Sequence, residues 1–509
     1  MTPRILAVVL LSALLALPAP STRAQTKDTL TVGLVWINDT LDPHMHYQRV
    51  GILININMFD SLLHKNTKLE YEPSLATSWK ALNDTTWEFK LRKGVKFHNG
   101  DPLTAEDVKF SFDRVLEPGK EQKRSPQYGN VRAIKEVKIV NPETVHLVTD
   151  KPFPLLLERL VFFPIVPKKH IEKVGDAAFA ESATVGTGPW KLVEWKRGQH
   201  LRLEAFNDHW RGKPAFKNLM FREIPEVATQ MAELKTGGVD LIRNVSADLL
   251  PEIKTHAQTY VTSAPILRTH YMMLDMRSEP FNKKLARQAA NHAIDREAIV
   301  QKMMAGLGRV VPTVVHPLAF GYDSSVTPYP YDPKKAKALL AQAGYPNGVD
   351  ITIHSAFTEF RPVFEAMAQM LTEAGIRTTA KIWDPGPAYN KFFQGEGKAT
   401  HGAYGSWGYY SVFDADAILH PLYHTEPGGW IGKWYARVEG LDPMIDQARS
   451  ILDQPRRRQI YSQIQKLIKE EAPSIFLFHQ YDTLGVSKKV EYAARGDEWL
   501  WLYDSKPKR

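Results

Sequence analysis

The sequence predicts a protein of the α/β or α+β class with several interleaved domains, and three observations support this prediction. Short strand-like and helix-like segments alternate from one end of the chain to the other. The chain has 509 residues, which is enough for about two to four domains with large cores. No Pro/Gly/Ser-rich linker divides it. We therefore expect interleaved domains, and paired chain crossings between such domains can act as a hinge.

Two segments have the alternation of half-buried strands. In residues 29–36 (TLTVGLVW) the apolar positions that end in Trp36 are expected to point inward. Further along, Trp87, Phe89 and Leu91 alternate with charged residues in the same way.

Helix start and stop signals recur along the chain. Thr104 with Asp107 three residues later is a capping box, and prolines at first helical positions and glycines after last turns mark other helices. The predicted helices run from Thr104 to about Leu116, from Pro225 to Lys235, from Asp332 to Gly344 and from Pro362 to Ala374, with a further start at Asp442-Pro443.

Residues 1–24 have the pattern of a cleaved secretory signal peptide. Arg4 precedes an apolar run from Ile5 to Leu17, and Thr22-Arg23-Ala24 resembles a cleavage site. The alternative, a buried first helix, is disfavoured by Pro18 and Pro20. We expect a mature protein outside the cytoplasm.

The chain contains no cysteine, which excludes disulfides, thiolate metal ligands and a lipid-anchored cysteine after the signal. These absences favour a free periplasmic protein. The formal net charge is +9, but the densest basic stretch, 119–138, also contains Glu121 and Glu136. We interpret this stretch as a solvated face and expect no nucleic-acid partner.

Motifs for common enzyme chemistry are missing. There is no G-x-S-x-G, H-E-x-x-H or G-x-x-x-x-G-K-[ST], and Gly306-Leu307-Gly308 lacks the third glycine of a dinucleotide-binding turn. Asp414 and Asp416 are expected on opposite sides of a strand, a poor geometry for a shared reaction centre. No cofactor is predicted.

A metal site at His420 and His424 is an open alternative. A spacing of four places two imidazoles on one helix face, but Pro421 makes a regular helix doubtful. We therefore expect surface or hydrogen-bonded histidines here, and no metal.

Taken together, eight segments resemble one family, the extracellular solute-binding proteins of family 5, which are dipeptide-, oligopeptide- and nickel-binding components of ABC importers. In chain order these segments are LDPHMHYQ, NMFDSLL, EPSLATSWK, TWEFKLRKGVKFHNGDPLTAEDVKFSFDRV, GTGPWKLVEWKRGQHLRLEAFNDHWRG, LARQAANHAIDREAIV, YDPKKAKALLAQAGYPNG and RRRQIYSQIQKLIKEEAPSIFLFHQY. They cover nearly the whole mature chain.

The resemblance implies a type II periplasmic binding protein with three lobes and a hinge between two main lobes. Lobe I would comprise residues 25–61, 186–265 and 479–509, lobe II the insertion 62–185, and lobe III residues 266–478. A small peptide or peptide-like, conjugated polar solute would be captured between lobes I and III. The monomeric receptor would then deliver it to an inner-membrane ABC permease without catalysis.

Three alternatives remain open. Within this class the ligand could be nickel or another metal complex. From other classes, the rivals are a secreted hydrolase that uses Asp414 and Asp416, and a chaperone-like binder of unfolded segments.

The segment 404–418 (YGSWGYYSVFDADAI) is the main candidate for a cleft wall. In peptide-binding relatives the matching segment carries an aspartate soon after the tryptophan, and this acid pairs with the amino terminus of the peptide. No acid lies between Trp407 and Asp414 here, so amine binding would depend on Asp414 or Asp416. The tyrosines instead suit sugar-like, aromatic or conjugated ligands. An aromatic core strand is the alternative interpretation.

Other candidate contacts flank the expected cleft, and a ligand carboxylate would meet Arg268 or Arg361. The predicted ligand-binding residues are Tyr404, Trp407, Tyr409, Tyr410, Asp414, Asp416, His44, Tyr47, Arg268, Tyr271 and Trp383, the last on a loop with Tyr389.

Overall fold

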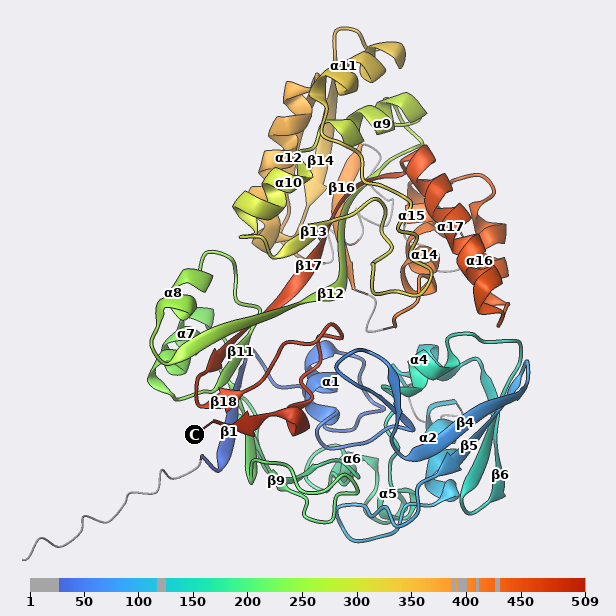
Figure 1. The fold of residues 1–509 in the computed structure, drawn as a ribbon, viewed down its shortest axis with the longest axis vertical. Coiled ribbons are helices and arrows are strands. Elements are labelled where there is room, and N and C mark those ends of the chain that lie inside the picture. Colours follow the sequence, from blue (N-terminus) through green and yellow to red (C-terminus); the bar gives the residue numbers. More distant parts are fainter. Residues whose placement is uncertain are drawn as a thin grey trace, which may run out of the picture.

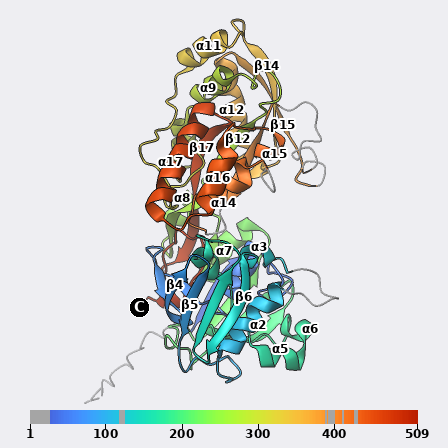
Figure 2. The same cartoon turned by 90° about the vertical axis from the view of Figure 1, so that its right-hand side faces the viewer.

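Two long antiparallel strands join the two main parts of the molecule. They are β12 (Thr259–Leu274) and β17 (Ser474–Ser487), which run from the lower part into the upper part (Figure 1). This computed structural model describes residues 27–116, 125–386, 390, 401–408, 412–425 and 431–508. Figure 2 shows α16 and α17 on one side of the upper part, and the strands β4, β5 and β6 in the lower part.

One mixed sheet of 11 strands passes through both parts, in the order β15-β14-β16-β12-β17-β11-β1-β10-β9-β8 with β13 paired to β17. The pairing of β12 with β17 shifts register between Pro265 and Thr269. A register shift interrupts the regular ladder, so the sheet is locally irregular where the two parts join.

We name the three lobes by their sheets. Lobe I contains the strands β8 to β11 and β1, with α1, α7 and α8 and the carboxyl-terminal segment. The elements of lobe I are β1 (Thr29–Leu34), α1 (Arg49–Asn55), α5 (Lys168–Val174), α6 (Asp176–Phe179), β8 (Trp190–Lys196), β9 (His200–Ala205), β10 (Asn218–Glu223), α7 (Val227–Thr236), β11 (Leu241–Arg243), α8 (Leu250–Thr255), β18 (Val490–Glu491), a 3₁₀ turn (Leu502–Asp504) and β19 (Lys506–Pro507). The helices α5 and α6 fall within the insertion 62–185 predicted for lobe II, but we describe them with lobe I because Ile171 and Phe179 join its apolar core.

The inner strand β1 does not alternate as predicted. It lies between β10 and β11, parallel to both, and Leu30 to Leu34 are all buried. Parallel strands covered on both faces are buried throughout. Trp36, predicted to point inward, lies beyond the end of the strand and is 37% exposed, so that prediction was wrong.

Lobe II has a four-stranded antiparallel sheet in the order β4-β5-β7-β6, packed on α2. The elements of lobe II are β2 (Leu63–Lys65), β3 (Tyr71–Pro73), β4 (Ala76–Asn83), β5 (Thr86–Leu91), α2 (Ala105–Leu116), α3 (Tyr128–Val131), β6 (Ile134–Asn141), β7 (Thr144–Thr149) and α4 (Leu156–Leu160). The predicted strand is β5, with Phe89 and Leu91 buried. The predicted capping box is also confirmed, because the backbone N–H and the hydroxyl of Thr104 both donate to Asp107 at 2.8 Å.

Lobe III carries apolar clusters on both faces of its sheet. On β12, Tyr271 and Met273 join one cluster, whereas Met272 and Leu274 join the other. The elements of lobe III are α9 (Lys284–His292), α10 (Arg296–Ala298), a π-helical turn (Ile299–Met303), β13 (Gly308–Val310), α11 (Pro333–Gln342), β14 (Val349–Ser355), a 3₁₀ turn (Thr358–Phe360), α12 (Arg361–Glu373), β15 (Ile376–Ile382), β16 (Gly402–Gly408), α14 (Asp416–Tyr423), α15 (Ile431–Trp434), α16 (Leu441–Arg449) and α17 (Gln454–Glu471).

Most helix signals are confirmed. The helices α7, α11 and α12 lie where they were predicted, and Gly237, Gly344 and Gly375 follow them with positive φ. Asp442 is an exception: α16 begins at Leu441 after Gly440, and the Asp442 carboxylate instead accepts from the backbone N–H of Thr425 at 3.2 Å.

The predicted α/β class is confirmed. The residue boundaries given for the three lobes stay predictions. Within the part of the chain that the structure describes, no helix is both long and apolar enough to cross a membrane.

Candidate functional site

Three parallel strands of lobe III run toward one edge of the sheet. β14 is parallel to β15 and to β16; Ser355 and Ile382 are paired at the ends of their strands, and β16, which starts beside the end of β14, continues beyond them to Gly408. Arg268 of β12 pairs with Gly408 and therefore lies at this edge too. Ligands of open α/β sheets bind outside the carboxyl ends of strands, so this edge is the candidate binding wall of lobe III.

Lobe I meets this edge through Arg49, the first residue of α1. A Cβ atom built at Gly408 would lie 2.9 Å from Arg49 Nη2, so the guanidinium lies directly against the backbone at this position. Arg49 Nη1 forms an ion pair with Glu498, whose side chain is almost fully buried. Arg49 and Glu498 were missed in the sequence because 449 positions separate them and neither belongs to a recognised pattern.

Exposed apolar side chains lie near the end of β1 in lobe I. Val35 and Trp36 follow the strand directly, and Met45 comes a few residues later, all with more than a third of their surface exposed. Tyr47, a predicted contact, is half-buried and packs against the core of lobe I.

Trp407 is anchored by a helix irregularity. Pro421 lies inside α14 and has no N–H, so the carbonyl of Ala417 one turn earlier lacks its helical donor. The indole N–H of Trp407 donates to that carbonyl at 3.3 Å. The ring is thus held at the end of β16 and remains half-buried.

The Pro421 prediction needs a correction. We expected Pro421 to make a regular helix doubtful, yet α14 spans Asp416–Tyr423 with the proline inside it. The donation from Trp407 to the freed carbonyl explains how the helix tolerates this proline.

Two further predicted contacts lie at the same edge of lobe III. Trp383 follows β15, is half-buried and donates its indole N–H to His354 Nδ1 at 3.0 Å. Arg268 is half-buried beside Gly408. Arg361, the other candidate for a ligand carboxylate, begins α12 on the exposed side and donates to Glu365 at 3.0 Å.

Three predicted contacts lie in cores instead. Tyr404 is fully buried, and its hydroxyl bonds to His270 Nδ1 at 2.8 Å. Tyr271 is buried in the neighbouring apolar cluster. His44 is buried in the lower part, where Nε2 lies 2.9 Å from the carbonyl of Pro164 and the ring stacks on Phe163.

Asp414 and Asp416 are both buried and bound to arginines of lobe III. Arg457 Nη2 donates to both oxygens of Asp414, at 3.1 and 2.9 Å, and the hydroxyl of Tyr461 donates at 2.9 Å. Arg449 Nε lies 3.1 Å from Asp416. Burial raises the pKa of Asp416 to about 6, although Arg449 opposes the shift.

The two acids also differ from the predicted strand geometry. Asp414 forms an isolated bridge with Phe320, and Asp416 is the first residue of α14. Their carboxylates are therefore held by separate arginines.

The imidazoles of His420 and His424 lie close together, with one carboxylate near His424. The two rings lie 4.9 Å apart, and His424 Nε2 is 3.4 Å from Asp446. Burial and the nearby Arg449 lower the pKa of His420 to about 3. In the ranges that the structure describes, no group of three or more His, Asp or Glu side chains is placed to hold a metal ion.

Two predicted contacts, Tyr409 and Tyr410, lie outside the described residues, as do Tyr389 and the predicted signal peptide.

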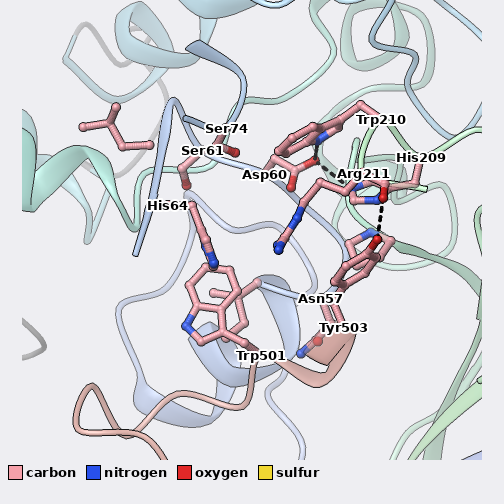
Figure 3. Close-up of a pocket in the computed structure, with 13 residues that line it drawn as sticks. Asn57, Asp60, Ser61, His64, Ser74, His209, Trp210, Arg211, Trp501 and Tyr503 are labelled. Carbon is pink, nitrogen blue, oxygen red and sulfur yellow. Dashed lines mark hydrogen bonds and ion pairs between the residues drawn. The ribbon is translucent and has the colours of Figure 1, made fainter. Parts of the chain in front are cut away.

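A small polar cavity lies between lobes I and II, lined by residues such as Asp60, His64, Arg211 and Trp501 (Figure 3). Its volume is about 20 Å³, enough for about one water molecule. Trp210 Nε1 donates to Asp60 at 3.0 Å. Burial raises the pKa of Asp60, but the His209 imidazole 3.6 Å away and the hydrogen bond from Trp210 outweigh it and hold this pKa below its ordinary value. The cavity is therefore part of the seam between two lobes.

A receptor that closes around its ligand is the class of protein that this architecture defines. Two strands connect the main lobes, and Arg49 of lobe I meets Gly408 and Arg268 of lobe III. Comparison with known proteins agrees. The model of "Bacterial extracellular solute-binding proteins, family 5 Middle" matches residues 70–430, more than half of the chain.

Individual relatives cover most of the chain. Heme-binding protein A of Haemophilus influenzae is 29% identical over 459 residues, 84% of this chain and 82% of that protein. Glutathione-binding protein GsiB of Shigella flexneri is 27% identical over 475 residues, 91% and 90% of the two chains. The solved structure of HbpA2 from Haemophilus parasuis has a TM-score of 0.84 at 24% identity and covers 94% of this chain and 100% of that one.

The chain therefore belongs to family 5 of the bacterial extracellular solute-binding proteins. Proteins of this family are periplasmic substrate-binding components of ABC importers and are not enzymes. The predicted solute-binding function and type II periplasmic-binding-protein fold are confirmed.

Proposed function

We propose that this protein captures a small peptide or peptide-like, conjugated polar solute between lobes I and III. The solute is then delivered to an inner-membrane ABC permease. The receptor acts as a monomer in the periplasm after cleavage of residues 1–24, and it has no catalytic activity and no nucleic-acid partner. The observation that carries the proposal is the meeting of Arg49 of lobe I with the carboxyl end of β16 at Gly408.

The chemistry of the two walls supports a solute of this class. Arg49 and Arg268 flank Gly408 and can bind a carboxylate through paired N–H donors. Trp407, Trp383 and Trp36 offer flat apolar faces for the rest of the molecule. The glutathione-binding relative is named for a tripeptide that carries carboxylates, which matches the arginines of these walls.

The proposed contact set therefore keeps part of the predicted residues and adds others. It contains Trp407, Trp383, Arg268 and Tyr47, with Arg49 and Trp36 added. Tyr409 and Tyr410 stay predicted contacts. The carboxylates of Asp414 and Asp416 are bound to Arg457 and Arg449, so a ligand amine would have to be met elsewhere or by backbone carbonyls.

Closure follows from where these contacts lie. They belong to both lobes, so a solute completes them only when the lobes come together. A ligand shifts a two-state equilibrium by its differential affinity for the two states, and solute binding therefore favours the closed form.

Trp407→Ala is expected to weaken solute binding by about 1–3 kcal/mol, because a large aromatic contact is lost at a desolvated site. Calorimetric titration with glutathione as the first probe measures the change. Trp195→Ala is the matched control: this half-buried tryptophan lies on β8 in lobe I, and its removal is expected to leave affinity unchanged. Equal affinity of folded Trp407→Ala and wild-type protein would assign Trp407 to the scaffold.

A further inference from the structure

Lobe II touches lobe III through a backbone hydrogen bond next to the candidate binding wall. The backbone N–H of Phe413 donates to Glu158 Oε2 at 2.9 Å, and the bond is buried. Glu158 lies on α4 of lobe II, whereas Phe413 lies between β16 and α14 of lobe III. In Figure 1, α4 lies directly below α14. The bond therefore links two lobes that are not consecutive in the chain.

Glu158 is held in place within lobe II. Lys65 Nζ donates to its two oxygens at 2.7 and 2.8 Å, and the hydroxyl of Tyr71 donates to Oε1. Lys65 is 1% exposed and Glu158 is 8% exposed. Lys65 and Tyr71 are the paired ends of the hairpin β2–β3. The carboxylate is thus pre-oriented, with one oxygen directed at lobe III.

The same hairpin adds apolar contact to lobe III. Lys65 Nζ lies 4.3 Å from the centre of the Phe413 ring, a cation–π geometry. Leu69, in the loop of the hairpin, packs against the apolar cluster of lobe III.

On the other side, Phe413 is fixed to lobe III. Its carbonyl accepts from the backbone N–H of Phe320 at 2.8 Å. The next residue, Asp414, is bound by Arg457 and Tyr461 of α17. A force on the Phe413 amide is therefore transmitted to the body of lobe III.

We propose that Glu158 is a positioning residue for solute capture, which ties lobe II to the segment after β16 and makes lobe II part of the closing surface. This inference rests on the proposed function, because it assigns the contact to the closed form of that receptor. The carboxylate acts through Phe413 and does not touch the solute.

The contact favours the closed form for a physical reason. A carboxylate that accepts a backbone N–H forms a charge-assisted hydrogen bond, which is stronger than a neutral one. In the open form both groups are bound by water, and the cation–π contact is absent. Such a bond contributes about 1.5 kcal/mol or more, which corresponds to about a tenfold higher ratio of closed to open molecules.

Two double variants isolate this bond. Lys65→Met with Glu158→Gln removes both buried charges and keeps an oxygen that accepts from Phe413. Lys65→Met with Glu158→Leu removes the same charges and also the acceptor. Because neither variant leaves an unpaired buried charge, a difference between them reports on the interlobe bond.

The readout is the distance between lobes II and III by pulsed EPR. The chain has no cysteine, so Lys135→Cys and Lys337→Cys, both exposed, accept unique spin labels. Without solute, the glutamine variant is expected to retain a short-distance population that falls about fivefold, relative to the long-distance one, in the leucine variant, because a neutral hydrogen bond contributes about 1 kcal/mol. The wild-type protein, whose bond is charge-assisted, is expected to have the largest short-distance population. Identical distributions in the glutamine and leucine variants would overturn the proposal.

A second measurement uses only the wild-type protein, so it does not depend on whether a variant folds. Hydrogen exchange of the Phe413 amide in the wild-type protein is expected to be slow without solute and slower with glutathione. Fast exchange in both conditions would overturn the proposal. The EPR distances are measured without solute, so they test the interlobe bond whether or not glutathione binds. Failure of glutathione to bind would count against the proposed function only.

Discussion

Replacing Arg457 by methionine is expected to lower the free energy of unfolding by about 3–5 kcal/mol, because Asp414 is then a buried carboxylate without a cation. Asp414 and Arg457 are both almost fully buried and pair at 2.9 Å. Burial already raises the pKa of Asp414, and Arg457 opposes this shift. Without Arg457, the pKa of Asp414 rises further and the carboxyl binds a proton. Urea unfolding at pH 7 measures the change.

The matched control is Arg457→Met with Asp414→Asn. The neutral amide needs no cation, and the hydroxyl of Tyr461 still has an oxygen to bind. Most of the lost free energy is expected to return in this double variant. If Arg457→Met were as stable as the wild-type protein, the buried carboxylate of Asp414 would not need the ion pair with Arg457. The claim that this ion pair stabilises lobe III would then be wrong.

Acidification from pH 7 to pH 4 is expected to destabilise the protein strongly, because neutral histidines are buried near the hinge. His270 and His479 lie on β12 and β17 and are fully buried. Burial lowers the pKa of each to about 3, and the nearby Arg268 and Arg309 act in the same direction. Their neutral forms are bonded: His479 Nδ1 to the hydroxyl of Thr269 at 2.8 Å, and His270 Nε2 to Gln480 at 3.0 Å.

The sign of this effect follows from the two pKa values. In the unfolded chain a histidine titrates near 6.5, so below this pH the unfolded state binds protons that the folded state does not. Above pH 6.5 the two histidines are neutral in both states and do not lower the free energy of unfolding. As the pH falls from 6.5 toward 3, the unfolded state gains protons that the folded state does not bind, and the free energy of unfolding decreases. For a pKa difference of this size each histidine costs about 3 kcal/mol at pH 4. Asp416, with its pKa raised to about 6, gains a proton in the folded state and offsets about 2 kcal/mol of this loss at pH 4.

Urea unfolding at several pH values between 7 and 4.5 tests this expectation. The wild-type free energy of unfolding is expected to fall steadily, and His479→Gln to show a shallower fall because one titrating group is gone. A free energy of unfolding that is constant from pH 7 to pH 5 would contradict the account.

Local sequence signals predicted much of the fold. The Thr104–Asp107 box, the Asp332 cap and the glycines after α7, α11 and α12 act through neighbours in the chain, so their patterns are visible without tertiary structure. The error at β1 has a tertiary cause. An inner parallel strand is covered on both faces, and its sequence cannot show which strands will flank it.

The candidate site was less predictable, because its geometry depends on contacts between distant segments. Tyr404 and Trp407 lie three residues apart on β16, yet one is fully buried and the other half-buried. Arg49 gains its place through Gly408 and Glu498, and Glu158 through Phe413, pairs that no local pattern links. The resemblance of the sequence indicated the family, whereas the contacts within these pairs form only in the folded structure.

The most direct test of the central claim is a thermal-shift screen of the refolded, solute-free protein. The panel contains di- and tripeptides, glutathione, sugar–amino-acid conjugates, oligosaccharides, aromatic acids and nickel with histidine. A solute at 100 times its dissociation constant adds about 2.7 kcal/mol of stability, which is a clear shift. The account predicts a shift with peptides, glutathione or another amino-acid conjugate, and a smaller shift in Trp407→Ala. A shift only with nickel–histidine, or none with any peptide-like solute, would contradict it.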